Sequence, residues 1–161
     1  MHLRRAVPAD FSGMWPIFQE VVASESTYVF TADTSEAEAF AYWFGPGVTS
    51  YVAEEGGAVV AMYKLVANQV GLGGHVANAS FMVAARAGGR GIGRQLGLHC
   101  LQQALEAGFL AMQFNFVVST NAAAVKLWQS LGFTIVGTLP QVFRHRELGL
   151  VDAFVMHRFL E

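Results

Sequence analysis

Hydrophobic residues recur along this chain at two different spacings, and each spacing predicts one kind of element. Apolar positions three or four residues apart indicate four helices, whereas short apolar runs bounded by glycine and polar residues indicate seven strands. The helices are expected at residues 10–23, 34–44, 93–107 and 121–131, and the strands at residues 2–5, 50–54, 58–67, 75–83, 111–118, 133–139 and 151–159. This order, β-α-α-β-β-β-α-β-α-β-β, is typical of an α+β fold with a mixed, mostly antiparallel sheet.

Several residues mark the ends of these elements. Asp10 is a candidate N-cap for the first helix, and Pro16 is expected to confine or kink the start of that helix. Thr34 is a candidate N-cap for the second helix, with Glu38 close to the capping-box position. A polar loop is expected between the last two strands, and it contains Arg144, His145 and Arg146.

The composition narrows the class of partner. The chain is 53% hydrophobic with a mean hydropathy of +0.39, which is high for a soluble protein. Charged, polar and glycine residues interrupt every apolar stretch, so no membrane span is expected. A formal charge of −2 and a pI of about 6.2 provide no basic surface for nucleic acid or for an anionic membrane. The excess of apolar residues instead indicates buried contacts between subunits, and we expect a homodimer.

The N-terminal sequence and the cysteine content indicate the compartment. No apolar signal region follows Arg4 and Arg5, and the single cysteine, Cys100, cannot form a disulfide within the chain. Both features fit a reducing, cytoplasmic location. No repeat, low-complexity tract or linker is present, so residues 1–161 are expected to form one domain.

A glycine-rich segment carries the most specific chemical signal in the chain. Residues 88–96 read G-G-R-G-I-G-R-Q-L and lie between the strand at 75–83 and the helix at 93–107. A strand that enters a glycine-rich turn and then a helix points several backbone N–H groups at one place, beside the positive end of the helix dipole. Glycine is needed because a side chain would block close approach of the backbone. The segment therefore predicts a site for a ligand that carries a diphosphate.

Two familiar phosphate-binding motifs fit this segment poorly. Gly88 and Gly93 have the spacing of a P-loop, but the Lys and Ser or Thr that should follow are missing. A dinucleotide fingerprint that starts at Gly89 or Gly91 lacks its third glycine and lies mid-chain rather than after a first strand. A glycine-rich surface turn without a ligand is the simpler alternative.

A second motif lies downstream, where residues 121–133 read N-A-A-A-V-K-L-W-Q-S-L-G-F. Asn121 is a fair helix N-cap, and Gly132 suits the left-handed position that follows a helix. Apolar residues at helical spacing form a stripe between them. Alone, these residues indicate a capped helix followed by a strand. Their combination with the glycine-rich segment, one strand earlier, is much more specific.

Together the two motifs resemble the GNAT family of acyl-CoA N-acyltransferases. Gly91 and Gly93 fit the small residues of that family's pyrophosphate pattern, Q/R-x-x-G-x-G/A, whereas Gly88 stands where the family usually has Arg or Gln. Residues 121–133 are similar to the family motif N-x-x-A-x-x-L-Y/W-x-x-x-G-F. The resemblance implies a GNAT-like sheet with helices on both faces, acetyl-CoA as co-substrate and no metal. The cofactor-binding residues that it implies are Met82, Val83, Gly88, Gly89, Arg90, Gly91, Ile92, Gly93, Arg94, Asn121, Ala124 and Trp128.

Residues 75–81, 114–121 and 125–140 are similar to a narrower group within this family. That group includes the fungal N-acetyltransferases that act on azetidine-2-carboxylate and other proline-like imino acids. The resemblance implies that Asn78 and Asn115 lie around the acceptor and that Asn121 faces the cofactor. The first 45 residues show no comparable match, and the acceptor stays open because specificity in these folds comes largely from the first two helices.

The chemistry that the resemblance implies is direct attack of an amine on a thioester. The strand around Phe81, Met82 and Val83 is expected to present backbone groups to the pantetheine arm, and one N–H there to polarise the thioester carbonyl. Met82 is assigned this role, and Asn115 is assigned to the amine. Trp128 stands where many family members have a tyrosine acid, and an indole N–H cannot play that role. A thiol with a pKa of about 8.5 leaves readily as the thiolate, so Trp128 is assigned to packing or cofactor contact.

Several polar residues are candidates to bind or deprotonate the acceptor, and each has a structural alternative. His75 either acts as a base through water or is a structural histidine. Asn78 and Asn115 either satisfy backbone groups or hydrogen-bond the acceptor. The loop between the first two helices offers three candidates to select the acceptor, of which Tyr28 is assigned that role: Glu25, Tyr28 and Asp33.

Three functions are compared. The leading hypothesis is an N-acetyltransferase for a small-molecule amine such as an amino or imino acid. The second keeps acetyl-CoA and takes a protein N-terminus or lysine, which would favour an open acidic groove. Aromatic residues near the N-terminus indicate a closed pocket instead: Trp15, Phe18, Tyr28, Phe30 and Trp43. The third is a non-catalytic CoA-binding or dimerisation module.

Overall fold

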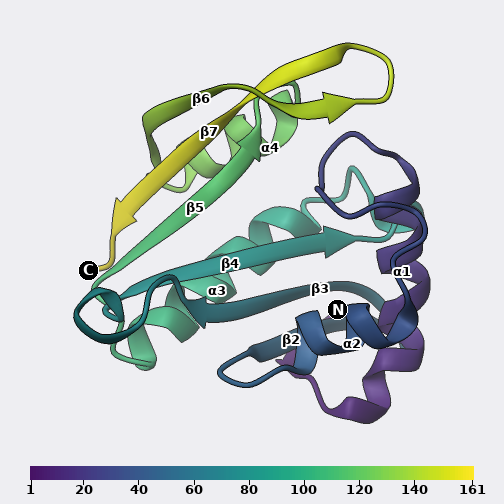
Figure 1. The fold of residues 1–161 in the computed structure, drawn as a ribbon. Helices are drawn as coiled ribbons and strands as arrows, with labels where there is room; N and C mark the ends of the chain where they lie inside the picture. The colour runs from purple at the N-terminus through teal and green to yellow at the C-terminus, as the bar shows by residue number, and fades with distance from the viewer.

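The structure, a computed structural model, describes residues 1–161 as a seven-stranded sheet with helices on both faces (Figure 1). The strands are β1 (His2–Arg5), β2 (Thr49–Glu55), β3 (Ala58–Ala67), β4 (Val76–Val83), β5 (Ala111–Val118), β6 (Thr134–His145) and β7 (Gly149–Phe159). The helices are α1 (Phe11–Ala23), α2 (Glu36–Phe44), α3 (Ile92–Glu106) and α4 (Ala122–Ser130). Short 3₁₀ turns lie at Pro8–Asp10, Gly71–Gly73 and Ala85–Ala87.

The sheet has the order β1-β2-β3-β4-β5-β7-β6, and every neighbouring pair is antiparallel except β4 and β5. The expected α+β fold with a mixed, mostly antiparallel sheet is therefore confirmed. Helices α1 and α2 lie on one face of the sheet, and α3 and α4 lie on the other (Figure 1). Both α1 and α3 pack on β3 and β4, so the middle of the sheet is covered on both sides.

The one parallel pair is also the shortest. β4 and β5 are in register only at Val76↔Ala111 and Ala77↔Met112, after which the strands diverge. The molecule consequently divides into two parts that are joined at one end of these strands and open at the other (Figure 1). Backbone groups that face the opening have no sheet partner, so they bond to other groups or remain available to a ligand.

An apolar core fills the space between the sheet and its helices, which accounts for the high hydrophobic fraction of the chain. α1 buries a stripe at helical spacing, formed by Phe11, Met14, Phe18 and Val22. Pro16 is exposed in the second turn of α1 and does not end the helix. None of the helices has the length and apolar character that crossing a membrane requires.

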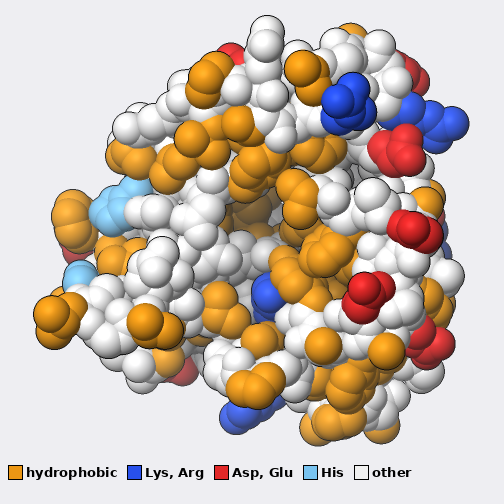
Figure 2. Space-filling model, in the orientation of Figure 1, with side chains coloured by type: hydrophobic (Ala, Val, Ile, Leu, Met, Phe, Trp, Pro, Cys, Tyr) orange, Lys and Arg blue, Asp and Glu red, His pale blue; other side chains and the backbone are white.

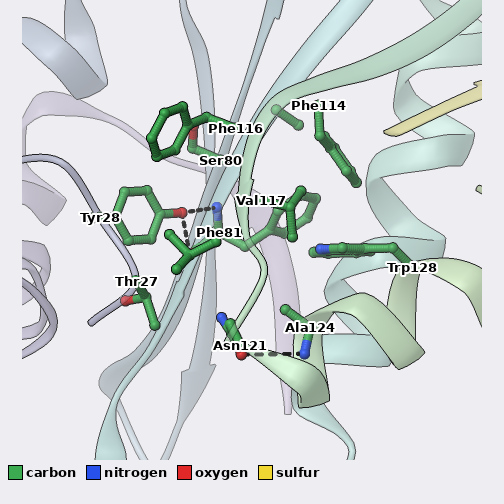
Figure 3. Close-up of a pocket in the computed structure, with 12 residues that line it drawn as sticks. Thr27, Tyr28, Ser80, Phe81, Phe114, Phe116, Val117, Asn121, Ala124 and Trp128 are labelled. Carbon is green, nitrogen blue, oxygen red and sulfur yellow. Dashed lines mark hydrogen bonds between the residues drawn. The ribbon is translucent and has the colours of Figure 1, made fainter. Parts of the chain in front are cut away.

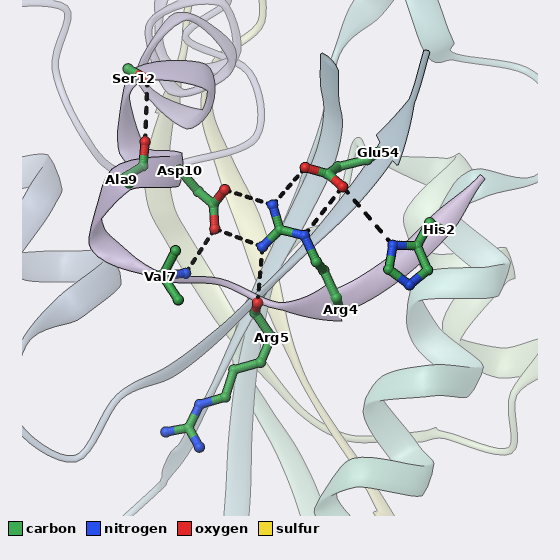
Figure 4. A network of polar contacts seen from close by, with 8 residues as sticks. All are labelled: His2, Arg4, Arg5, Val7, Ala9, Asp10, Ser12 and Glu54. Atoms are coloured by element: carbon green, nitrogen blue, oxygen red, sulfur yellow. Dashed lines mark hydrogen bonds and ion pairs between the residues drawn. The ribbon is translucent and has the colours of Figure 1, made fainter. Parts of the chain in front are cut away.

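A charged cluster fastens the N-terminal strand to its neighbour (Figure 4). The Arg4 guanidinium on β1 donates to both carboxylate oxygens of Asp10, at 2.7 and 2.9 Å, and to both of Glu54 on β2. These bonds hold the pKa values of the Asp10 and Glu54 carboxyls below their usual range, because the guanidinium favours the charged carboxylates. Asp10 also accepts from the Val7 N–H at 2.7 Å. It makes no side-chain cap to α1, contrary to expectation, because Arg4 and Val7 hold its oxygens.

The second helix begins slightly later than the sequence indicated. Its N-cap is Ser35 rather than Thr34, because the Thr34 hydroxyl donates to the Thr31 carbonyl. The Ser35 Oγ accepts from the Glu38 N–H at 3.1 Å, and the Glu38 carboxylate accepts from the Ser35 N–H at 2.7 Å. This is a complete capping box, so the predicted role of Glu38 is correct and the predicted cap is wrong by one residue.

The C-terminal hairpin differs most from the sequence prediction. β6 and β7 extend almost to the turn, so Arg144 and His145 belong to β6 rather than to a polar loop. β6 is an edge strand, where a proline such as Pro140 is tolerated because it need not donate to a neighbour. A register shift follows this proline, with Gln141 at a φ of 51°, and the strand then resumes pairing with β7.

Candidate functional site

A cavity of about 130 Å³ lies where β4 and β5 have separated (Figure 3). Its walls come from both strands, from the first turns of α4 and from the loop between α1 and α2. Nine of its twelve lining residues are hydrophobic, and none carries a charge. The lining residues are Thr27, Tyr28, Ala79, Ser80, Phe81, Phe114, Phe116, Val117, Val118, Asn121, Ala124 and Trp128.

The Tyr28 hydroxyl occupies the place that a strand partner would take. It donates to the Phe81 carbonyl at 2.6 Å and accepts from the Phe81 N–H at 2.8 Å (Figure 3). Burial of the hydroxyl raises the pKa of Tyr28, so this group stays protonated and keeps its donor at neutral pH. One side chain thus satisfies both backbone groups that the divergence of β5 leaves without a partner.

The opening where β4 and β5 have separated is called the split below. The direction of the backbone groups along β4 identifies the residues that face it. The Ala84 N–H donates to the Val60 carbonyl on the β3 side. Successive residues in a strand point their N–H groups to opposite sides, so Met82 also faces β3, whereas Phe81 and Val83 face the split. Of the three residues expected to supply an N–H donor, Phe81, Met82 and Val83, the Met82 N–H is turned away from the split, and those of Phe81 and Val83 face it. The Met82 side chain is 2% exposed and belongs to the core.

The glycine-rich segment forms an open turn before α3. Gly89 and Gly91 have φ values of 74° and 75°, a conformation that other residues rarely adopt. The backbone N–H groups of residues 89–94 donate no hydrogen bond within the protein, and the first such bond in α3 runs from the Gln95 N–H to the Gly91 carbonyl at 3.2 Å. A continuous row of free N–H donors at the N-terminus of a long helix is suited to binding an anion.

Two arginines flank this row of N–H groups. Arg90 forms an ion pair with Glu55, at the end of β2, and it holds the pKa of that carboxyl below its usual range. Arg94 donates to the Ser130 Oγ at 2.9 Å and has no carboxylate partner. Both guanidiniums are exposed next to the turn. Ile92 anchors the turn, since its side chain is 3% exposed and belongs to the core.

Helix α4 supplies a further wall of the cavity. Asn121 caps this helix as the sequence predicted, because its Oδ1 accepts from the Ala124 N–H at 3.3 Å. Trp128 is 8% exposed, and its ring packs against Phe81 and Phe114 with centroid distances of 4.7 and 4.8 Å. The indole nitrogen points toward the cavity (Figure 3).

The two asparagines that were assigned to the acceptor make hydrogen bonds within the protein. The Asn78 Nδ2 donates to the Gln113 carbonyl at 2.8 Å and so bridges β4 and β5 just beyond their last pair. Asn115 is exposed, donates to the Asn68 Oδ1 at 2.6 Å and accepts from the Gln113 Nε2 at 2.9 Å. Neither side chain lines the cavity. Their contact with an acceptor stays a prediction.

A larger cavity, of about 520 Å³, shares Tyr28 with the first. It lies between the loop at 25–31 and the tip of the β6–β7 hairpin. Its charged and titratable lining residues are Glu25, Arg144, His145 and Arg146. The two remaining candidates lie in neither cavity: His75 is exposed at the closed end of the split, and Asp33 accepts from the Thr31 hydroxyl.

Sequence reasoning missed several residues of the site. Ser80 lies between the predicted positions Asn78 and Met82 on β4, and only the pleat of the strand shows that it faces the cavity. Lys64 was also missed, although it is the single charge in the apolar run A-V-V-A-M-Y-K-L-V-A of β3. It is directly opposite Ser80 in the β3–β4 pair and is 8% exposed. A buried charge in an apolar strand is the signal that would have found it.

These features suit a long ligand with a diphosphate at one end and an acyl group at the other. The free N–H groups of residues 89–94 are suited to an anion, and β4, whose open edge reaches the cavity, ends just before this turn. The apolar lining of the cavity excludes water from a reacting group. A CoA thioester has this arrangement of diphosphate, amide-containing arm and acyl group, so the residues present fit that class of ligand.

Comparisons with known proteins agree with this geometry. The family model described as "Acetyltransferase (GNAT) family" matches residues 15–133. The N-acetyltransferase aca1 of Schizosaccharomyces pombe is 31% identical over 99 residues, which cover 61% of this chain. The chain spans about half the length of that protein, since the match covers 47% of it.

Two solved structures are similar over nearly the whole chain. A GCN5-related N-acetyltransferase from Kribbella flavida is 44% identical, with a TM-score of 0.94 and coverage of 99% of this chain and 97% of that one. A GNAT superfamily phosphinothricin acetyltransferase from Sinorhizobium meliloti, solved in complex with AcCoA, is 26% identical. Its TM-score is 0.87, and the match covers 99% of this chain and 88% of that one.

We expect Tyr28→Phe to lower the free energy of unfolding by about 1–3 kcal/mol, because it leaves the Phe81 N–H and carbonyl unsatisfied in the split. Urea unfolding at pH 7 measures this loss. Tyr51→Phe is the matched control: it removes a hydroxyl bonded only to the partly exposed Gln103 side chain and should cost less than about 1 kcal/mol. Equal losses in the two variants would contradict the special role of the Tyr28 hydroxyl.

Proposed function

The chain belongs to the GNAT acetyltransferase family, and from this premise we propose that it transfers an acetyl group from acetyl-CoA to the amine of a small molecule, by direct attack in a ternary complex. The observation that carries the proposal is the row of free N–H groups at residues 89–94, beside the open edge of β4. Residues 1–161 act as a single catalytic domain in this proposal, and no metal takes part.

The diphosphate-binding residues follow from the turn before α3. The free N–H groups of residues 89–94 surround the diphosphate, and Arg90 and Arg94 add positive charge beside its oxygens. Gly88 stands where the family usually has Arg or Gln, so in this chain Arg90 and Arg94 supply the positive charge instead. The Val83 backbone faces the split and bonds the amide-containing arm, while Asn121, Ala124 and Trp128 form the opposite wall.

The acyl end lies in the cavity. The Phe81 N–H donates to the thioester carbonyl, in place of the hydrogen bond that it makes to the Tyr28 hydroxyl, and so stabilises the oxygen as negative charge develops. The amine nitrogen forms a bond to the carbonyl carbon, the carbon–sulfur bond breaks and the thiolate leaves. Trp128 packs and excludes water, and needs no acidic function because a thiol of pKa about 8.5 is a good leaving group.

The reaction also requires that the amine lose a proton. No Asp, Glu or His lines the cavity, so the acceptor enters as its neutral amine and releases its second proton to solvent after attack. Asn78 and Asn115 lie on either side of the joined end of the split and, with Tyr28, are the proposed acceptor contacts.

The size and lining of the cavity favour a small acceptor over a protein. A cavity of about 130 Å³ lined by aromatic rings leaves little room for a peptide chain. A protein N-terminus or lysine as acceptor is the second candidate, and it would need an open acidic groove. The adjoining cavity carries two arginines against one glutamate, which does not favour a basic peptide. A non-catalytic CoA-binding module is the remaining alternative.

We expect thiol release from acetyl-CoA in the presence of small primary or secondary amines. The assay is a screen of amino acids, imino acids, simple amines and short peptides with a thiol-reactive dye. Turnover with a small amine and not with peptides supports the proposal. Turnover with peptides alone favours the protein acceptor. Tight acetyl-CoA binding with no turnover on any acceptor supports the third hypothesis, a non-catalytic CoA-binding module.

Gly91→Val is expected to raise the acetyl-CoA KM roughly tenfold or more, because a β-branched side chain both strains a φ of 75° and projects toward the diphosphate. Gly108→Val is the matched control, since Gly108 has a φ of 87° and equally open space at the other end of α3. This control carries the same kind of strain and should leave KM unchanged. Similar KM values in both variants would refute the placement of the diphosphate.

We also propose a homodimer that forms through the β6–β7 hairpin. β6 is an unpaired sheet edge, and this hairpin exposes several large apolar side chains: Ile135, Val136, Val142, Leu148 and Leu150. Light scattering at micromolar concentration should give twice the chain mass, and Val136→Glu should reduce it to one. Leu72→Glu, at a fully exposed apolar residue away from this hairpin, should keep the dimer. A monomeric wild-type protein would rule the assembly out.

A further inference from the structure

Lys64 is the only charged residue that the core buries. Its side chain is on β3, the residue is 8% exposed, and Ser50 is the one other polar residue with comparable burial. Removing an ammonium group from water is costly unless a partner of opposite charge compensates. No Asp or Glu lies within ion-pair distance of Lys64.

The contacts that Lys64 does make are with one aromatic residue of α2. The Nζ donates to the Tyr42 carbonyl at 3.1 Å and lies 3.2 Å from the centroid of the Tyr42 ring. A ring face attracts the charged ammonium and not the neutral amine, so these contacts favour the cation. Burial lowers the pKa of Lys64 to about 8, which leaves it mostly charged at pH 7.

Lys64 does not line the cavity itself, but it lies next to a residue that does. Lys64 is directly opposite Ser80 in the β3–β4 pair, and Ser80 lines the cavity at the split. The Tyr42 hydroxyl donates to the Ser80 Oγ at 2.6 Å and completes a polar group of three side chains. Asn78, two residues along β4 from Ser80, lies on the same face of the strand.

The space-filling view shows this part of the molecule from the side of α1 and α2 (Figure 2). A hollow separates the two parts of the molecule, with hydrophobic side chains on its walls and a basic side chain on its floor. The neighbour of Lys64 in sequence, Tyr63, points to the opposite face, where its hydroxyl bonds to His99 of α3. The glycine-rich turn leads directly into α3, so Lys64 is on the other face of the sheet from the end of the helix that would hold a diphosphate.

We propose that Lys64, supported by Tyr42 and Ser80, is the specificity-determining residue of the acceptor site and pairs with a carboxylate that the acceptor carries next to its amine. This inference rests on the proposed function. A carboxylate would supply the opposite charge that the protein itself does not place beside this buried lysine. The same contact places the neighbouring amine beside the split, where the Phe81 N–H faces the cavity.

The first test compares acids with their carboxamides in the wild-type enzyme. L-alanine, L-proline and L-glutamine are assayed beside alaninamide, prolinamide and glutaminamide by thiol release from acetyl-CoA. We expect kcat/KM for at least one acid to exceed that of its amide tenfold or more, although the amide offers the less basic amine. Turnover that is equal, or that favours the amides, overturns the inference and leaves the proposed function intact. Absence of turnover with every amine, despite acetyl-CoA binding, overturns both.

The second test changes the lysine. Lys64→Met keeps the length of the side chain and removes its charge, and it should reduce the acid-to-amide ratio to near one with the acetyl-CoA KM unchanged. Lys64→Arg should keep a preference for the acid. Lys126→Met is the matched control, since Lys126 is the only other lysine and is exposed on α4. Its ratio should equal that of the wild type.

Two outcomes of this second test contradict the assignment. Loss of turnover with acid and amide alike in a folded Lys64→Met protein would assign Lys64 to proton transfer or to structure. A preserved ratio in Lys64→Met that disappears in an Arg144→Gln/Arg146→Gln variant would move the carboxylate to the larger cavity. Thermal unfolding of each variant establishes folding, and the comparison of acids with amides in the wild type stands even if Lys64→Met does not fold.

Discussion

A parallel strand pair that stops after two residues leaves backbone donors and acceptors facing open space inside a protein, and that is the position of β4 beside β5. The site follows from this constraint. Phe81 would lose both of its strand hydrogen bonds, and the Tyr28 hydroxyl replaces them from a loop far away in the sequence. Asn78 bridges the strands where pairing ends, and aromatic rings from β4, β5 and α4 line the space that results. The opening is thus stabilised around its rim while its centre stays accessible to a ligand.

The same split separates two kinds of anion recognition. On the face of α3, free N–H groups at a helix N-terminus suit a diphosphate, and they carry their partial charge without a buried ion. On the face of α1 and α2, Lys64 carries a full charge that the protein itself does not neutralise. Two substrates that approach from opposite faces would meet at the Phe81 N–H.

The sequence was sufficient for the elements whose signals are local. The helical stripe of α1, the capping-box glutamate Glu38, the glycine-rich turn and the Asn121 cap all follow from residues close to one another. The errors arose where distant residues decide the outcome. The cap of α2 moved to Ser35, and β6 continued past Pro140 because it lies at an edge. Of the three residues expected to present an N–H on β4, Met82 faces β3 instead of the split. Tyr28 and Lys64 act through partners on other elements, and no periodicity shows such contacts.

The central claim is that acetyl-CoA binds along the open edge of β4 with its diphosphate on residues 89–94. A ¹H–¹⁵N NMR titration of the protein with acetyl-CoA tests it directly, because each amide in the argument reports separately. The account predicts that the largest shift changes fall on Phe81 and residues 89–94. Met82 and Ala84, whose N–H groups face β3, should change much less. Saturable binding that leaves Phe81 and residues 89–94 unchanged would contradict it.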